Sequence, residues 1–161
     1  MILKLKDGEV KIKLFADIAP NHVKRFKALA DSNQYDGVVF HRVIDGFMAQ
    51  TGDVEFGNST NHKYDLAKAG TGGSNLPDLK AEFSNISHEK GILSMARSSD
   101  PNSANSQFFI CFADAPHLDR NYTAFGKVIE GMEFVDMIKR GNDPNGSVID
   151  PDKIISLRSV Q

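Results

Sequence analysis

Apolar and polar residues alternate at the start of the chain. In residues 2–15, ILKLKDGEVKIKLF, leucine, valine and isoleucine fall at nearly every second position on either side of Asp7 and Gly8. A period of two is typical of strands with one buried face. The segment therefore predicts two antiparallel strands joined by a tight hairpin at Asp7–Gly8, a dipeptide that tolerates the positive φ of such a turn.

The spacing of apolar residues changes to that of a helix in residues 21–32. Four apolar residues recur there at intervals of one to three positions on one helical face: Val23, Phe26, Leu29 and Ala30. Pro20 near the start and Asn33 just past the end are typical boundary residues. The pattern predicts an amphipathic helix.

The rest of the chain contains mostly strand-like segments. Residues 37–53 are rich in β-branched and aromatic residues, and Asp45–Gly46 interrupts them. The polar, turn-rich residues 54–80 predict a long loop, of the kind that is usually functional or mobile. We expect further strands at 91–96, 106–113, 123–129 and around 153–159, and a short second helix at 131–141. Many short strands with two helices favour an all-β barrel or a sandwich, which pairing of the first and last segments could close.

Composition narrows the class of protein. The 161 residues fit one domain, 1–161, and the net charge of -2 argues against nucleic acid as a partner. The single cysteine, Cys111, excludes an intramolecular disulfide and is expected to be a small buried hydrophobe. Because the chain shows neither a secretory signal nor an apolar stretch of bilayer length, we expect no membrane association and a cytoplasmic location.

Three patterns that suggest cofactor or metal chemistry fail on inspection. The GTGG of residues 70–73 lacks the Gly-Lys-Ser/Thr of a phosphate-binding loop. Residues 119–130 have oxygen ligands at calcium-loop spacing, but Ala124 stands where the sharp turn needs glycine. None of the five histidines forms an i, i+4 pair. We therefore expect neither a metal nor a cofactor.

Arg42 interrupts a mostly apolar segment, VVFHRVIDGFM, in residues 38–48. An arginine is almost never fully buried without a partner. Taken singly it would be an ordinary exposed residue on a strand, and the apolar residues around it would belong to the core. Gln50 follows on the same short segment.

Three segments together resemble the cyclophilins, the cyclosporin-binding class of peptidyl-prolyl cis–trans isomerases. They are FHRVIDGFMAQTGD at 40–53, GILSMARSSDPNSANSQFFICFADAPHLD at 91–119 and YTAFGKVIEGMEFVDMI at 122–138. The resemblance covers nearly the whole chain. It implies a mainly β fold, a closed eight-stranded antiparallel β-barrel capped by two α-helices, with an active groove on its outer face, and a monomer.

The resemblance also implies roles for individual residues. The catalytic arginine falls on Arg42, and Gln50 matches the glutamine that helps to hold the arginine and the substrate carbonyl. The loop containing Gly70 and Thr71 borders a secondary pocket. The expected proline pocket consists of Phe47, Met48, Phe109 and Leu118, and the expected peptide channel is lined by Ala96, Arg97 and Gln107. His117 and Tyr122 match further substrate-binding positions of the groove.

The chemistry of X–Pro rotation needs these residue types. Amide resonance gives a rotational barrier of roughly 18–20 kcal/mol, and in the twisted transition state the prolyl nitrogen becomes a hydrogen-bond acceptor. A guanidinium offers several N–H donors in a fixed fork and stays charged, so Arg42 suits a purely electrostatic role. The apolar pocket would hold the proline ring and exclude water.

Three positions depart from the family's usual residues. Tyr122 stands where many members have histidine, and we expect it to retain activity with altered substrate fit. His117 replaces the tryptophan of strongly drug-binding members, so cyclosporin is expected to bind weakly. Arg97 replaces asparagine and adds a second cation, which favours acidic peptides.

The expected activity is peptidyl-prolyl isomerisation in proline-containing peptides and unfolded proteins, assisting protein folding. The alternative is a proline-peptide-binding module or holdase chaperone with little turnover. A purely structural barrel is less favoured, because it gives no reason for Arg42, Gln50 and Phe109 to occur together.

Overall fold

Eight strands form one antiparallel sheet in the structure, a computed structural model that describes residues 1–160. The strands are β1 (Ile2–Leu5), β2 (Gly8–Leu14), β3 (Arg42–Ile44), β4 (Met48–Thr51), β5 (Ile92–Met95), β6 (Phe108–Cys111), β7 (Ala124–Glu130) and β8 (Ser156–Arg158). The helical segments are α1 (Pro20–Asp31), α2 (Met132–Val135) and a 3-10 turn, η1 (Pro116–Leu118). The predicted mainly β fold with two helices is confirmed.

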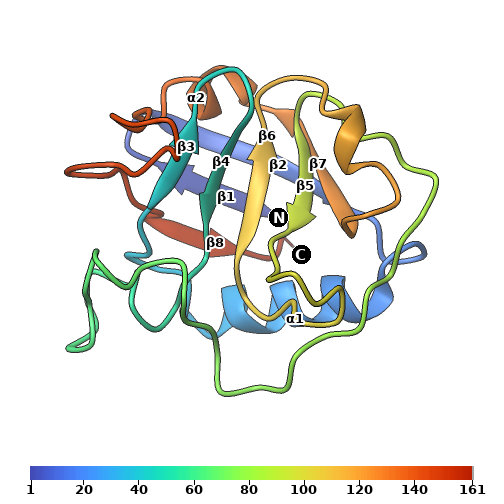
Figure 1. The fold of residues 1–161 in the computed structure, drawn as a ribbon, viewed down its shortest axis with the longest axis horizontal. Coiled ribbons are helices and arrows are strands. Elements are labelled where there is room, and N and C mark those ends of the chain that lie inside the picture. Colours follow the sequence, from blue (N-terminus) through green and yellow to red (C-terminus); the bar gives the residue numbers. More distant parts are fainter. Residues whose placement is uncertain (161) are drawn as a thin grey trace.

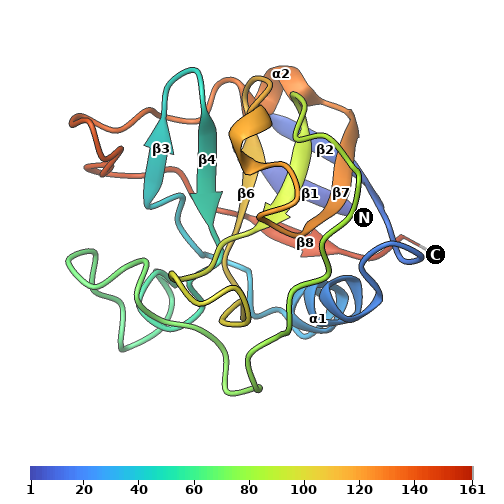
Figure 2. The same cartoon turned by 45° about the vertical axis from the view of Figure 1, so that its right-hand side comes forward.

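The sheet curls into a barrel. Its strand order is β3-β4-β6-β5-β7-β2-β1-β8, so β1 pairs with both β2 and β8, as expected for the first and last segments. Figures 1 and 2 show β3, β4, β6, β5 and β7 as one wall, with β2, β1 and β8 behind it.

The edge strands β3 and β8 meet through the segments that precede them. The Phe40 amide donates to the Asp152 carbonyl at 2.8 Å, and the Ile154 amide donates to the Val38 carbonyl at 2.9 Å. Within residues 1–160, these backbone bonds and an isolated bridge between Val39 and Lys153 close the barrel, in place of a full ladder between the two edge strands.

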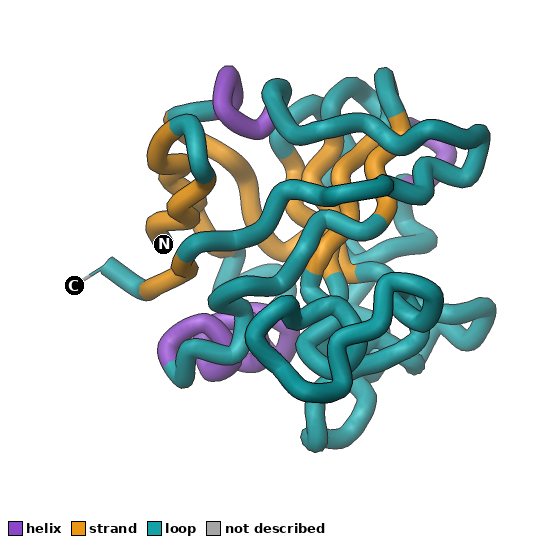
Figure 3. Tube along the Cα trace, turned by 90° about the vertical axis from the view of Figure 1, so that its left-hand side faces the viewer, coloured by secondary structure: helices purple, strands orange, loops and turns teal. Residues whose placement is uncertain are grey.

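The helices lie at opposite ends of the sheet (Figure 3). Helix α1 confirms the predicted amphipathic segment within one residue at each end, and Asn33 beyond it takes a left-handed φ of 67°. Its buried face inserts Phe26 among the barrel's aromatic residues, 5.0 Å from Phe108 and 4.9 Å from Phe125 between ring centroids. Helix α1 therefore closes one end of the core.

The second helix is shorter than predicted. Only Met132–Val135 is α-helical, whereas the sequence predicted residues 131–141. Val135 and Ile138, three residues apart in the predicted segment, are both buried. The chain leaves the helix to reach the barrel edge, where the Gly141 amide donates to the Val43 carbonyl at 2.8 Å.

The prediction that Gly8 lies in the hairpin turn with a positive φ is wrong. Leu5 pairs with Gly8, so the turn consists of Lys6 and Asp7, and Gly8 begins β2 without a positive φ. A Cβ on Gly8 would lie 2.5 Å from the ring of Phe134. Glycine is therefore needed there for close packing of α2 against the hairpin.

Strands β4, β5 and β6 are buried on both faces. Alternate residues of β6 point to different apolar clusters: Phe108 and Ile110 to the barrel interior, Phe109 and Cys111 to a second cluster outside it. Met48, Leu118 and Ala124 also belong to the outer cluster. Two-sided burial explains the nearly continuous apolar run of residues 106–113 and confirms that Cys111 is buried.

Across residues 1–160, no helix combines the length and apolar character required to cross a membrane.

Replacing Gly8 with alanine is expected to lower the free energy of unfolding by about 1–3 kcal/mol, because the added methyl displaces the packed Phe134 ring. Urea unfolding measures the loss. Glu9→Ala, an exposed neighbour in the same strand, is the control and should change stability by less than about 0.5 kcal/mol. Equal stabilities of the two variants would contradict the packing explanation.

Candidate active site

A row of side chains crosses the outer face of the barrel wall. Arg42 on β3 lies opposite Gln50 on β4, Gln50 lies opposite Phe109 on β6, and Phe109 lies opposite Ser94 on β5. Directly paired residues of neighbouring strands point to the same face. The register alone therefore brings a cation, an amide and an aromatic ring side by side.

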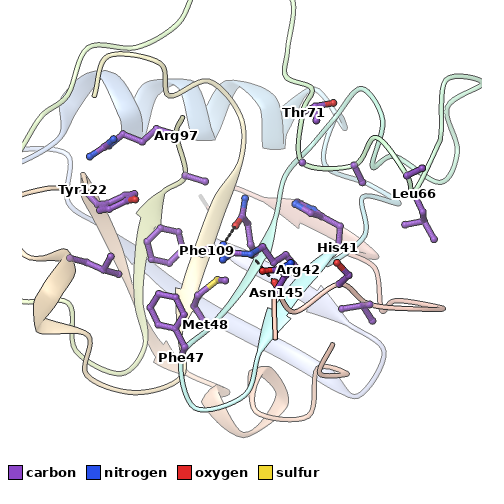
Figure 4. Close-up of a pocket in the computed structure, with 18 of the residues that line it drawn as sticks. His41, Arg42, Phe47, Met48, Leu66, Thr71, Arg97, Phe109, Tyr122 and Asn145 are labelled. Carbon is purple, nitrogen blue, oxygen red and sulfur yellow. Dashed lines mark hydrogen bonds between the residues drawn. The ribbon is translucent and has the colours of Figure 1, made fainter. Parts of the chain in front are cut away.

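This row lies in a groove with a volume of about 810 Å³. Figure 4 shows the groove with Arg42 near its centre, Phe47, Met48 and Phe109 on one side, and His41 and Leu66 on the other. Twelve of the thirteen residues predicted for the site line it: Arg42, Phe47, Met48, Gln50, Gly70, Thr71, Ala96, Arg97, Phe109, His117, Leu118 and Tyr122.

Gln107 is the exception. It lines an adjoining pocket of about 560 Å³, which shares Gln50, Gly70, Thr71, Ala96 and Arg97 with the groove. The loop of residues 70–73 lines this second pocket. The two pockets therefore adjoin at these five shared residues.

One side of the groove is apolar. Met48, Phe109 and Leu118 are each no more than 6% exposed and form its packed base. The Phe47 and His117 rings lie 5.4 Å apart between centroids, and Phe109 meets Tyr122 edge-on at 6.0 Å. Such a wall can enclose a small saturated ring and keep water from it.

Arg42 is exposed at the groove and is held by two acceptors. Its Nε donates to the Asn145 carbonyl at 2.9 Å, and its Nη1 donates to Gln50 Oε1 at 3.2 Å. The cation is therefore not buried, and it points into a groove in which two oxygens fix its plane.

The hydrogen bonds continue from Gln50 into the neighbouring loop. Gln50 Nε2 donates to Gln107 Oε1 at 3.0 Å, and Gln107 Nε2 donates to the Gly72 carbonyl at 2.9 Å. A guanidinium has only donors, so Gln50 must turn its oxygen toward Arg42 and its NH₂ toward Gln107. The same constraint then orients Gln107.

Arg97 lines both the groove and the adjoining pocket. Its guanidinium carbon stands 4.4 Å from the centroid of the Tyr122 ring, and its Nη2 donates to the Asn121 carbonyl at 2.7 Å. The second cation therefore extends the aromatic wall made by Tyr122 and Phe109.

His88 anchors the loop that carries His117 and Leu118. Its backbone amide and Nδ1 both contact the Asp119 carboxylate, at 2.7 and 3.1 Å, and its Nε2 contacts Ser94 Oγ at 2.8 Å. Burial lowers the pKa of His88 although Asp119 opposes the shift, so the imidazole is neutral at neutral pH. Ser94 and His88 are fully buried, which suits a structural clamp and denies a substrate access to the serine.

Sequence reasoning missed several groove residues: His41, Leu66, Ala67, Ala69, Asn145, Ser147 and Val148. Asn145 contributes a backbone carbonyl, which side-chain identity does not reveal. The alanines and Leu66 belong to the long loop predicted at residues 54–80, in which only Gly70 and Thr71 were given a role. His41 was considered only among the five histidines that lack metal-ligand spacing, although it directly precedes Arg42 and lines the groove.

The comparisons with known proteins agree with this geometry. A family model described as "Cyclophilin type peptidyl-prolyl cis-trans isomerase/CLD" matches residues 1–159. A probable peptidyl-prolyl cis-trans isomerase of Brucella suis biovar 1 (strain 1330) is 58% identical over 156 residues, 96% of this chain and 79% of that protein. Peptidyl-prolyl cis-trans isomerase-like 3 of Gallus gallus is 42% identical over 136 residues, 83% of this chain and 77% of that protein.

Solved structures show the same fold. A cyclophilin-type isomerase of Cryptosporidium parvum, crystallised in the presence of the dipeptide Ala-Pro, has a TM-score of 0.80 at 29% identity and covers 100% of both chains. A cyclophilin of Hirschia baltica has a TM-score of 0.77 at 26% identity, over 96% of this chain and 71% of that one.

The fold is that of the cyclophilins. The chain belongs to the cyclophilin-type peptidyl-prolyl cis–trans isomerase family, and its activity is that of an isomerase.

The Gln107→Glu variant tests the hydrogen-bond chain. A carboxylate at position 107 still accepts from Gln50 but cannot donate to the Gly72 carbonyl. One carboxylate oxygen would instead face the Gly72 carbonyl oxygen, and both are acceptors. Unfolding in urea should show a loss of about 1–3 kcal/mol. Gln34→Glu, an exposed glutamine in a turn, is the matched control and should be near neutral. A Gln107→Glu variant as stable as wild type would show that the chain does not constrain the loop.

Acid should destabilise the fold through His41. Burial lowers the pKa of His41 to about 4, against the opposing influence of Asp53, while the unfolded chain titrates near its ordinary value. The unfolded state therefore binds more protons between these values, and stability falls as the pH drops from roughly 6.5 to 4, by up to about 1.4 kcal/mol per pH unit.

The His41→Phe variant should flatten this dependence of the free energy of unfolding on pH, measured by urea titrations from pH 7.5 to 4. Val43→Ala, a buried neighbour without a titrating group, should lower stability equally at each pH and leave the slope unchanged. An unchanged slope in His41→Phe would disprove the assignment.

Proposed function

We propose that the groove binds X–Pro segments of polypeptides and that Arg42 is the residue that accelerates their rotation. In this proposal the pyrrolidine ring packs against the apolar wall of Phe47, Met48, Phe109 and Leu118. The observation that carries it is the placement of the Arg42 guanidinium, held by Asn145 and Gln50 next to that wall in one groove. Crystallisation of the Cryptosporidium parvum relative with Ala-Pro supports a proline-containing ligand.

The catalytic role rests on the electronic change during rotation. In the planar amide the prolyl nitrogen shares its lone pair with the carbonyl, but in the twisted form it becomes an acceptor. Asn145 and Gln50 occupy the Nε hydrogen and one Nη1 hydrogen of Arg42, which leaves the other N–H groups for the substrate. A donor that bonds the nitrogen only in its twisted form lowers the barrier without tightening ground-state binding.

The energetic requirement is modest. Each 1.36 kcal/mol of extra stabilisation in the twisted state gives about a tenfold increase in rate. Arg42 need not transfer a proton, because a permanently charged guanidinium acts by electrostatics alone. Gln50 orients the guanidinium and can also contact the substrate backbone.

Further proposals concern the substrates, the oligomeric state and the cellular location of the protein. We propose proline-containing peptides and unfolded proteins as substrates, with residues 1–161 acting as one domain and as a monomer in the cytoplasm. Weak cyclosporin binding remains a prediction, and it rests on His117 beside Phe47 at the groove.

Replacing Arg42 with alanine should lower kcat/KM for an X–Pro peptide by about 10²–10³-fold, the cost of removing a positioned donor to a transition state. A protease-coupled assay or NMR exchange spectroscopy measures the effect. Arg42→Lys is the matched control: it keeps the charge but loses the fork, so it should recover only part of the rate. An alanine variant as fast as wild type would remove Arg42 from the mechanism.

The same measurement separates catalysis from binding alone. If the groove served only to hold proline peptides, the wild-type protein would bind the peptide in a titration and leave its cis–trans exchange rate unchanged. We expect binding together with faster exchange.

A further inference from the structure

The groove continues past Arg42, away from the apolar wall of Phe47, Met48, Phe109 and Leu118, which we call the proline wall. Figure 4 places His41 and Leu66 on the opposite side of Arg42 from Phe109 and Tyr122. We call this part the flanking subsite, and it consists of His41, Leu66, Ala67, Ala69 and Val148. These residues line the same groove as Arg42 and Phe109, so a peptide bound at the proline wall and extended along the groove would meet them.

Four of the five residues of the flanking subsite are apolar, and none is a carboxylate, a lysine or an arginine. Leu66 is 41% exposed, so its isobutyl group stands at the rim rather than in the core, and Ala67 beside it is also exposed. Val148, whose amide donates to the His41 carbonyl at 3.3 Å, is buried. Burial lowers the pKa of His41, so its imidazole adds no charge at neutral pH. Arg42 is the nearest charged residue lining this side of the groove.

A buried carboxylate fixes the loop that supplies this wall. Asp53 is fully buried, and its Oδ1 accepts from the amides of Glu55 and Phe56 at 3.0 and 2.9 Å. Its Oδ2 accepts from the amides of Gly70 and Gly72 at 2.8 and 3.0 Å. One side chain therefore ties the beginning of the loop to its end, through charge-assisted bonds.

The segment around Leu66 is held within that closed loop. The Asp65 amide donates to the Phe56 carbonyl at 2.9 Å, and the Asp65 carboxylate accepts from the Ala67 amide at 3.0 Å. Gly70 has a positive φ of 104°, and a Cβ there would lie 3.2 Å from His41 Nε2, so the loop packs closely over the imidazole. A wall held in this way is preorganised, and the substrate does not bear the entropic cost of ordering it.

We propose that the flanking subsite binds an apolar side chain of the substrate on one side of the X–Pro pair, and that Leu66 determines this specificity. The proposal rests on the proposed function of the groove. An apolar side chain would leave water on contact with Leu66, Ala67 and Val148, whereas a carboxylate or ammonium group would lose hydration against the same apolar groups.

The experiment compares peptides that share one X–Pro core. One series carries leucine, glutamate or lysine at each of the three positions before the core, and a second series carries them after it. For wild type, kcat/KM should favour leucine over glutamate and lysine by roughly three- to tenfold at a position on one flank. Leu66→Glu should abolish the preference for leucine and favour lysine over glutamate there.

Two variants act as controls. Leu66→Met keeps an apolar rim and should retain the preference for leucine. Leu76→Glu introduces the same charge at a similarly exposed leucine outside the groove and should leave the preference unchanged. Should Leu66→Glu fail to fold, Leu66→Ser provides the same test, since it removes the apolar contact and should lose the preference.

The core peptide without flanking residues separates the two proposals. Suppose that wild type accelerates the core peptide. If Leu66→Glu then shows the same flank preferences as wild type, or if wild type shows no preference on either flank, the flanking subsite is disproved and the proposed function stands. If wild type fails to accelerate the core peptide, the proposed function itself is disproved.

Discussion

The groove depends on one constraint: a guanidinium donates hydrogen bonds and accepts none. Arg42 on the edge strand β3 needs hydrogen-bond acceptors, and Asn145 and Gln50 supply two oxygens. Because the Gln50 oxygen accepts from Arg42, the Gln50 NH₂ group donates to the oxygen of Gln107. The NH₂ group of Gln107 then donates to the Gly72 carbonyl. A single residue type thereby sets the orientation of two amides and joins an edge strand to a polar loop.

The sheet supplies the rigid base on which this chain of bonds rests. Because β4, β5 and β6 are buried on both faces, Phe109 and Met48 are fixed by apolar packing on the outer face and by Phe108 and Ile110 on the inner one. Sites built on packed strands hold their geometry better than sites on loops alone. The loops then add Arg97 stacked on Tyr122, and the Leu66 rim on a loop that Asp53 holds closed.

The sequence predicted most of the fold because local periodicity carries that information. Helix α1 and the eight strands lie where spacing and composition placed them, whereas the proline pocket was expected only from the family resemblance that the long motifs carry. The errors have physical causes. Gly8 was assigned to the turn because its contact with Phe134 is made in space, not along the chain. Asn145 acts through its carbonyl, and Leu66 lies in a polar loop, so neither leaves a pattern in side-chain chemistry.

The central claim is that an N–H group of Arg42 donates a hydrogen bond to the prolyl nitrogen of a substrate whose proline ring packs against the apolar wall. A crystal structure of the protein with an X–Pro peptide in the groove tests it most directly. The account predicts the proline ring against Phe109 and Met48, with an Arg42 N–H as the protein donor nearest the prolyl nitrogen. A guanidinium turned toward solvent, or a different donor closer to that nitrogen, would contradict it.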